Sequence, residues 1–126
     1  MGEQENLALA DRIWESANTG KLADALEEIL ADDCVQDWPQ SGEVIRGKAN
    51  IIAINRNYPG LPTATVRRRR AAGPLVVTEV DLDYGGKVYQ AISVVEIQEG
   101  KIVRETEYFA EPFDAPQWRS QWVERA

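Results

Sequence analysis

The sequence predicts an α+β fold in which a long antiparallel sheet wraps around helices from the first half of the chain. Apolar residues recur at helical spacing in that first half, whereas residues 63–110 form long segments that alternate with a period of two. Short turns separate these segments, and short connections favour antiparallel neighbours. With 126 residues, we expect one domain spanning 1–126 that buries a core without disulfides.

Helices are expected at residues 6–18, 22–30 and 47–57. Ile13 and Trp14 belong to the apolar face of the first, which ends at Thr19-Gly20. A short C-terminal helix is expected to begin at Asp114-Ala115-Pro116, an N-cap followed by a first-turn proline. It would place Trp118 and Trp122 four residues apart on one face.

Strands are expected at residues 34–38, 43–46, 63–72, 75–84, 87–99 and 101–110. The last two fold back on each other at Glu99-Gly100, which places Glu105, Glu107 and Tyr108 on a strand rather than in a loop. Polar side chains on a strand that should be central need either a solvated face or a pocket.

The composition limits the possible functions. The net charge of -7 argues against binding to nucleic acid or to an anionic membrane. No segment approaches the ~20 apolar residues of a membrane span, and the N-terminus lacks the apolar core of a signal peptide. The single cysteine, Cys34, is compatible with a reducing compartment, so we expect a cytoplasmic protein.

The chain contains no histidine. This excludes Ser-His-Asp and Cys-His catalysis and histidine-ligated zinc, so acid-base chemistry would fall to carboxylates, tyrosine or lysine. We expect no cofactor and no metal.

Four consecutive arginines, Arg67 to Arg70, must point alternately to the two faces of a strand. In one plausible register, cross-strand ion pairs join Arg67 to Asp81 and Arg69 to Glu79. Alternatively, two of the arginines reach into a cavity or a subunit interface as anion donors. A shift of one residue exchanges the two pairs.

Alternation on the last strand separates Ile102, Arg104, Thr106 and Tyr108 from Val103, Glu105, Glu107 and Phe109. A carboxylate held among aromatic side chains with few waters would have a raised pKa, as a general acid or base near pH 7 needs. Alternatively, Glu105 and Glu107 form ion pairs with Arg104, Lys101 or the arginine strand.

A second cluster, Asp37-Trp38-Pro39, precedes a turn, where the Asp37 carboxylate could sit at a pocket mouth or cap the turn. Aromatic residues could bind a substrate there, or pack in the core with satisfied polar tips. The candidate substrate-binding residues are Trp14, Trp38, Tyr58, Tyr89, Tyr108 and Phe109.

Two stretches stand in a recognisable order: RIWESANTGKLADALEEILADDCVQDWPQSGEVIRGKANI, then GKIVRETEYFAEPF. In order and spacing they resemble the SnoaL-like branch of the nuclear transport factor 2-like superfamily over nearly the whole chain. The resemblance implies a cone-shaped, strongly bent antiparallel sheet around three helices, also described as a cystatin-like α+β barrel, with a pocket in its mouth. It also implies a homodimer, which we expect to form through the sheet.

The resemblance extends to enzymes of this superfamily. Asp37 is similar in placement to the base of the ketosteroid isomerases, whereas Ile13 and Ser93 stand where their oxyanion donors would be. Asp37 or Glu107 could serve as the pocket acid of the polyketide cyclases.

Glu107 resembles the acid that the limonene epoxide hydrolases carry on their last strand. Those enzymes also use an Arg-x-Asp sequence on another strand. Asp81 stands where that aspartate would be, but Glu79 stands where the arginine would be.

We therefore expect a protein that binds a small hydrophobic, oxygenated ligand. It could be a cofactor-independent isomerase, cyclase or hydrolase that uses Asp37 or Glu107 for proton transfer. The alternative is a non-catalytic ligand carrier or a dimeric interaction module of the same fold.

Overall fold

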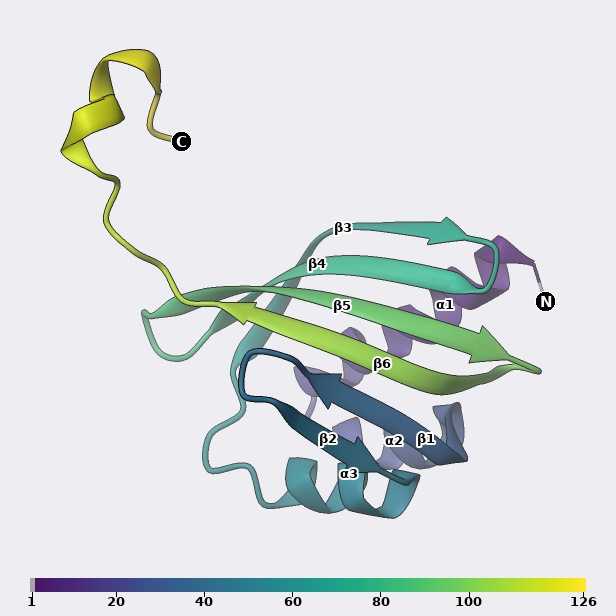
Figure 1. The fold of residues 1–126 in the computed structure, drawn as a ribbon. Helices are drawn as coiled ribbons and strands as arrows, with labels where there is room; N and C mark the ends of the chain where they lie inside the picture. Colours follow the sequence, from purple (N-terminus) through teal and green to yellow (C-terminus); the bar gives the residue numbers. More distant parts are fainter. Residues whose placement is uncertain (1) are drawn as a thin grey trace.

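The fold is seen in a computed structural model that describes residues 2–126, and it confirms the α+β class (Figure 1). The elements are α1 (Glu3–Ala17), α2 (Leu22–Ile29), β1 (Leu30–Trp38), β2 (Glu43–Arg46), α3 (Lys48–Arg56), β3 (Thr63–Ala72), β4 (Leu75–Asp83), β5 (Val88–Gln98), β6 (Lys101–Ala110) and the 3-10 helix η1 (Gln117–Trp122). Within residues 2–126 no helix has both the length and the apolar character needed to cross a membrane.

The strands form one bent sheet in the order β2-β1-β6-β5-β4-β3, with the three α-helices on its concave face (Figure 1). All neighbouring strands are antiparallel except β1 and β6, which are parallel. The sheet is therefore antiparallel, as expected, apart from this one parallel pair. The chain passes from β2 through α3 to β3 and then returns as a four-stranded meander. The last strand of this meander, β6, lies beside β1 and runs in the same direction.

The turn between β5 and β6 sets the register of the strands that bear the acids. Glu99 (φ 51°) and Gly100 (φ 75°) both adopt left-handed backbone, which suits a two-residue hairpin whose twist matches that of the strands. An irregularity at Glu96 and Ile97 then shifts the pairing. As a result, Ile102 shares the inner face with the acids of β6, although simple alternation placed it on the other face.

The core fills the end of the molecule nearest the β5–β6 turn. Ile29, Val76 and Ile102 are fully buried there, each worth roughly 1.5–3 kcal/mol relative to exposure. Cys34 is buried in the same core, and burial raises the pKa of its thiol to about 12, so it packs as a small apolar group. The opposite end is less completely filled.

The arginine run on β3 forms three ion pairs. They join Arg67 to Asp81 at 3.0 Å, Arg68 to Glu79, and Arg69 to Asp11 of α1 at 2.7 Å. The expected Arg69–Glu79 pair is wrong because a bulge between Val66 and Arg68 shifts the register. Arg69 consequently turns toward α1, and none of the four arginines lines the cavity described next.

Candidate active site

A cavity of about 100 Å³ lies between the helices and the inner face of the sheet, at the end away from the β5–β6 turn. Its walls are mainly apolar. The larger apolar side chains among them are Ile13, Trp14, Leu22, Leu26, Ile51, Ile54, Leu61 and Leu82. The polar groups that line the cavity are therefore surrounded by apolar side chains.

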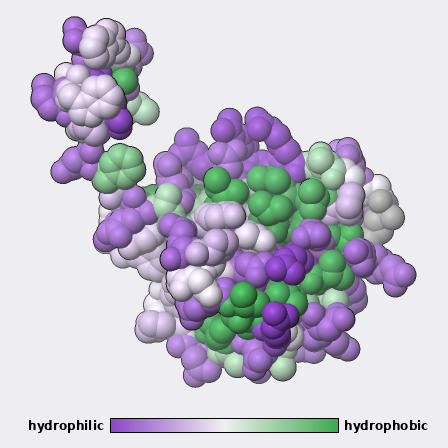
Figure 2. Space-filling view, in the orientation of Figure 1, coloured by the Kyte–Doolittle hydropathy of each residue, from purple (hydrophilic) through white to green (hydrophobic). Residues whose placement is uncertain are grey.

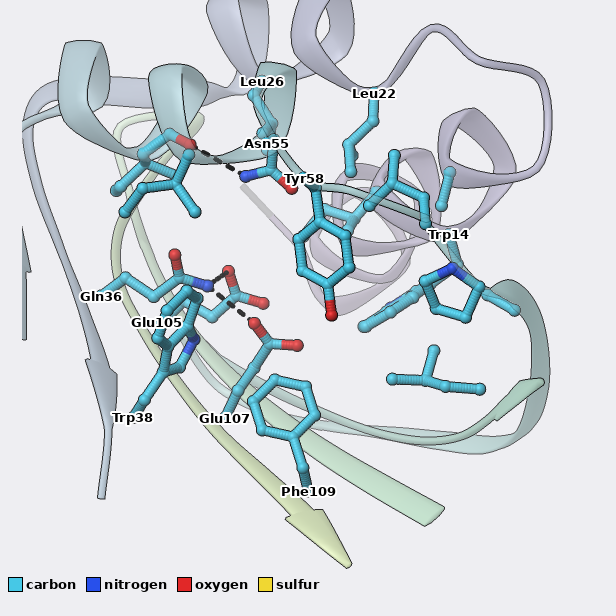
Figure 3. A pocket seen from close by; sticks show the side chains of 18 of the residues that line it. Trp14, Leu22, Leu26, Gln36, Trp38, Asn55, Tyr58, Glu105, Glu107 and Phe109 are labelled. Atoms are coloured by element: carbon cyan, nitrogen blue, oxygen red, sulfur yellow. Dashed lines mark hydrogen bonds between the residues drawn. The ribbon is translucent and has the colours of Figure 1, made fainter. Parts of the chain in front are cut away.

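Two carboxyl groups from β6 enter this cavity. Glu105 and Glu107 are two residues apart and so share one face of the strand, with Glu105 deeper at 5% exposure. Parallel pairing of β1 with β6 sets Gln36 directly beside Glu105. The Gln36 amide Nε2 donates to Glu105 Oε1 at 3.0 Å and to Glu107 Oε1 at 2.7 Å (Figure 3).

A single amide thus bridges both acids, and a third group completes the network. Ser93 on β5 donates its hydroxyl to Glu105 Oε2 at 2.8 Å, so hydrogen bonds engage both oxygens of Glu105. In Figure 3 the second oxygen of Glu107 points into the open part of the cavity. Glu107 is therefore the carboxyl group that a ligand would meet.

Burial raises the pKa of both glutamates above their ordinary value. The nearby Glu105 charge raises the pKa of Glu107 further, whereas hydrogen bonds from Ser93 to Glu105 and from Gln36 to Glu107 oppose the rise. Two neighbouring carboxyl groups that cannot both ionise readily titrate as a unit. The pair therefore favours holding one proton near neutral pH.

Aromatic side chains surround the mouth of the cavity, where an outer hollow of about 490 Å³ opens. Trp38 and Phe109 meet edge to face at 6.3 Å between ring centroids, and Tyr84 and Tyr89 do so at 5.4 Å. The Tyr58 and Tyr84 hydroxyls are hydrogen-bonded to each other at 2.8 Å. Planar or apolar groups would pack well in this hollow.

Two indole N–H donors at the cavity lack partners. Within residues 2–126, Nε1 of Trp14 and Nε1 of Trp38 are buried without a hydrogen bond. The Trp38 indole lies close enough to Glu107 to lower its pKa, but no bond of ordinary geometry forms. A buried donor without an acceptor costs about 1–3 kcal/mol, so these two groups reduce the stability of the fold.

The structure brings together five of the candidate catalytic and substrate-binding residues, in addition to Glu105. Glu107, Trp14, Trp38, Tyr58 and Phe109 all line the cavity. Tyr89 lies only in the outer hollow. Tyr108 is 43% exposed on the opposite face of the sheet, because its neighbours Glu107 and Phe109 point inward.

Asp37 does not line the cavity, contrary to the expectation that it would join Glu107 there. Alternation on β1 turns Gln36 and Trp38 inward and Asp37 outward. On the outer face its carboxylate forms an ion pair with Arg104 at 2.5 Å. Asp81, the other acid suggested by the resemblance to epoxide hydrolases, also lies on that face, paired with Arg67.

Gln36 and Tyr84 are site residues that the sequence did not single out. Gln36 lies between Cys34 and Trp38 in the period-two pattern, which is the one signal that could have placed it inside. The resemblance marks Ser93 only as the residue that replaces an oxyanion donor of the ketosteroid isomerases. In the structure its hydroxyl donates to Glu105 and holds that side chain in place. Within residues 2–126, no three metal-ligating side chains converge.

Comparison with known proteins points to one family. The model of the SnoaL-like domain matches residues 10–105. An NTF-2 like protein of unknown function from Burkholderia xenovorans LB400 is 39% identical, with 98% of this chain and 97% of that chain covered and a TM-score of 0.88. A candidate ketosteroid isomerase from Kribbella flavida DSM 17836 is 30% identical, with 98% and 91% covered and a TM-score of 0.89.

More distant structures share the fold alone. An LEH-like epoxide hydrolase from M. tuberculosis is 23% identical, with 85% of this chain and 84% of that chain covered and a TM-score of 0.70. A search of curated proteins found no match.

Proposed function

This chain belongs to the SnoaL-like domain family, and we propose that it binds a small apolar molecule bearing an oxygen function and transfers a proton on it through Glu107. The observation that most supports this is the pair of Glu105 and Glu107, bridged by Gln36 inside an otherwise apolar cavity. Proton transfer by a positioned carboxyl group typically accelerates a reaction by about 10²–10⁴-fold. The chemistry requires no further cofactor.

The three polar residues take different parts in this proposal. Gln36 holds Oε1 of Glu107 and leaves the other oxygen free for the ligand. Glu105 has both oxygens occupied, so it positions the pair and helps to keep one proton bound. In the protonated form Glu107 donates to a ligand oxygen, and in the ionised form it accepts a proton from a carbon next to a carbonyl group.

The cavity dimensions indicate the size of the ligand. A cavity of roughly 150 Å³ lined by apolar residues can hold benzene. The inner chamber of about 100 Å³ is smaller than that, so it suits one end of a molecule whose remainder would pack among the aromatic residues of the outer hollow.

The relatives are in keeping with proton transfer. Isomerisation of a ketone moves a proton between carbon atoms, and the Kribbella flavida protein is described as a candidate isomerase of this kind. An apolar chamber with one reactive carboxyl group would suit such a step on a smaller carbonyl compound.

The test is exchange of hydrogen for deuterium next to a carbonyl group. The protein would be incubated in heavy water with a panel of small cyclic ketones and enones, such as cyclohex-2-enone, and exchange followed by NMR. We expect Glu107→Gln to slow catalysed exchange on the order of 100-fold or more. Asp37→Asn, an acid of the outer face, is the matched control and should leave the rate within a few-fold.

Exchange by Glu107→Gln at the wild-type rate would refute the proposed role of this residue. A ligand carrier is the second candidate, favoured by the complete hydrogen bonding of Glu105, which is also typical of a purely structural network. Binding of the panel compounds in the cavity with no exchange in any of them would support the carrier instead.

A further inference from the structure

The outer hollow at the mouth of the cavity has a single charged side chain in its lining. Among residues 2–126, the hollow is lined by five aromatic side chains and one lysine: Trp38, Tyr58, Tyr84, Tyr89, Phe109 and Lys87. Within the same residues, no lysine or arginine lines the inner chamber. A ligand that fills both spaces would therefore meet one cation, at its outer end.

A tight turn between β4 and β5 fixes the backbone at Lys87. The Tyr84 amide donates to the Lys87 carbonyl at 2.9 Å. The Gly86 amide donates to the Asp83 carboxylate at 2.7 Å. Gly85 and Gly86 have φ angles of 81° and 108°, which favour glycine. Lys87 therefore leaves the turn at a defined point.

Alternation along β5 carries the Lys87 side chain to the inner face of the sheet. Ala91 and Ser93 are buried on that face, and Tyr89 and Lys87 continue the same two-residue spacing toward the mouth. The Lys87 ammonium lies over the Tyr89 ring, 5.4 Å from its centroid. Because the face of an aromatic ring attracts a cation, the ammonium is held at the edge of the hollow.

The inner face of β6 has polar groups at both ends of an aromatic stretch. Glu107 lies in the inner chamber, and Phe109 follows in the hollow. Glu111 comes next at the same spacing and pairs with Lys87. Four residues of extended chain separate Glu107 from Glu111, which corresponds to roughly 13 Å. Beyond Glu111 the chain leads away from the body and leaves the hollow open (Figure 2).

We propose that Lys87 forms an anion-binding subsite in the outer hollow and that the ligand is an amphipathic oxo acid. Its carboxylate pairs with Lys87, its apolar middle packs among the aromatic residues, and its carbonyl end reaches Glu107. The position of the carbonyl end rests on the proposed function. Lys87 would repel a cationic ligand end, whereas an uncharged end would leave the ammonium bound to Glu111 alone.

Glu111 is the group with which a ligand carboxylate would compete. The side chains of Lys87 and Glu111 are 54% and 59% exposed. Exposed ion pairs are weak, and an ammonium has three donors, so a ligand carboxylate can share Lys87 or replace Glu111. Removal of the Glu111 charge should therefore strengthen binding of the carboxylate. A lysine that served only to anchor Glu111 would not show this effect.

The test compares 7-oxooctanoate with 7-oxooctanamide, which differ in charge but hardly in shape. NMR titration would measure both affinities for the wild type and for Lys87→Met, which keeps an unbranched apolar side chain. We expect the variant to bind the acid on the order of 5-fold more weakly and the amide within about two-fold of wild type. Lys87→Arg should restore most of the preference for the acid, and Glu111→Gln should tighten binding of the acid alone.

Lys101→Met is the matched control because it removes the same charge at the opposite end of the sheet. Lys101 is exposed beside the β5–β6 turn, where its ammonium donates to the Glu28 carbonyl. It lines neither the inner chamber nor the outer hollow, so both affinities should stay within about two-fold of wild type. Circular dichroism would verify that each variant folds.

Equal weakening of acid and amide by Lys87→Met would overturn the proposal, since Lys87 would then support the hollow without recognising charge. So would a wild type that does not bind the acid, or that binds acid and amide equally well. An acid affinity that Glu111→Gln leaves unchanged would also contradict it.

Failure of the proposed function would look different. The acid would still be preferred through Lys87, but the hydrogens next to its ketone would not exchange in heavy water, and Glu107→Gln would have no catalysed rate to lower. That result would support the anion subsite and assign the protein as a carrier. Conversely, exchange that depends on Glu107 without any preference for the acid would overturn the subsite alone.

Discussion

Glu107 and Asp37 are acids on adjacent strands of one sheet, but they lie in opposite environments. Glu107 faces a cavity with apolar walls beside a second carboxyl group, and burial raises its pKa. Asp37 faces outward, where Arg104 neutralises its charge. The difference is one of side-chain direction rather than residue type, and it puts Glu107 but not Asp37 within reach of a ligand in the cavity.

The largest expected effect of this contrast on stability is a dependence on pH. The folded-state pKa values of Glu105 and Glu107 lie above the ordinary 4.5 of the unfolded chain, so the folded state binds protons more tightly. Stability should therefore be greatest at low pH as far as this pair is concerned, and it should fall as pH rises through the raised pKa values, by on the order of 1–3 kcal/mol.

Urea unfolding between pH 5 and pH 8 would measure this fall. The double variant Glu105→Gln/Glu107→Gln lacks both carboxyl groups of the cavity, so its stability should change much less over that interval. If the wild type and this variant showed the same pH dependence, the inner pair would not be the source.

A smaller effect is expected from removal of the bridge. Gln36→Leu keeps a similar side-chain volume but takes away the donor to both acids, leaving buried oxygens with fewer partners. This should cost about 1–3 kcal/mol in the free energy of unfolding. The pKa of the pair should also rise further, because Gln36 favours the ionised form of Glu107.

Unfolding at pH 5 and at pH 8 would separate these two consequences. The penalty of Gln36→Leu should be larger at pH 8, where ionised oxygens need the amide most. An equal penalty at both pH values would argue against a role for Gln36 in the titration of the pair.

The smallest effect is expected on the outer face. Asp37→Asn removes the ion pair with Arg104, whose side chain is 46% exposed. Pairs of this kind are worth about 0.2–1 kcal/mol and are screened by salt. Unfolding of Asp37→Asn and wild type in low and high salt should therefore converge at high salt; a cost well above 1 kcal/mol would mean that Asp37 has a further role.

The sequence alone predicted most of the fold because its signals are local. The two-residue turn at Glu99-Gly100, the period-two strands and the helical spacing around Trp14 depend only on neighbouring residues. The parallel pairing of β1 with β6 could not be predicted in this way, since it depends on how the whole meander returns to the first strand.

The candidate site was predicted in part. Glu107, Trp38 and Phe109 were correctly placed at one cavity because they follow their strands' alternation. For Asp37 the sequence left a pocket mouth and a turn cap as alternatives, because the inference used a turn and a family resemblance rather than the alternation from Cys34, which turns Asp37 outward. Gln36 was not predicted as a site residue, because an amide side chain indicates a site only when two acids are known to lie beside it.

The most direct test of the central contrast is a carbon-13 NMR titration of the side-chain carboxyl groups, with Glu105→Gln, Glu107→Gln and Asp37→Asn used to assign the signals. We predict that the Glu105 and Glu107 signals titrate together, well above the ordinary 4.5 of a glutamate, so that one proton is still bound as neutral pH is approached. Independent titration of both glutamates at or below 4.5 would contradict this account.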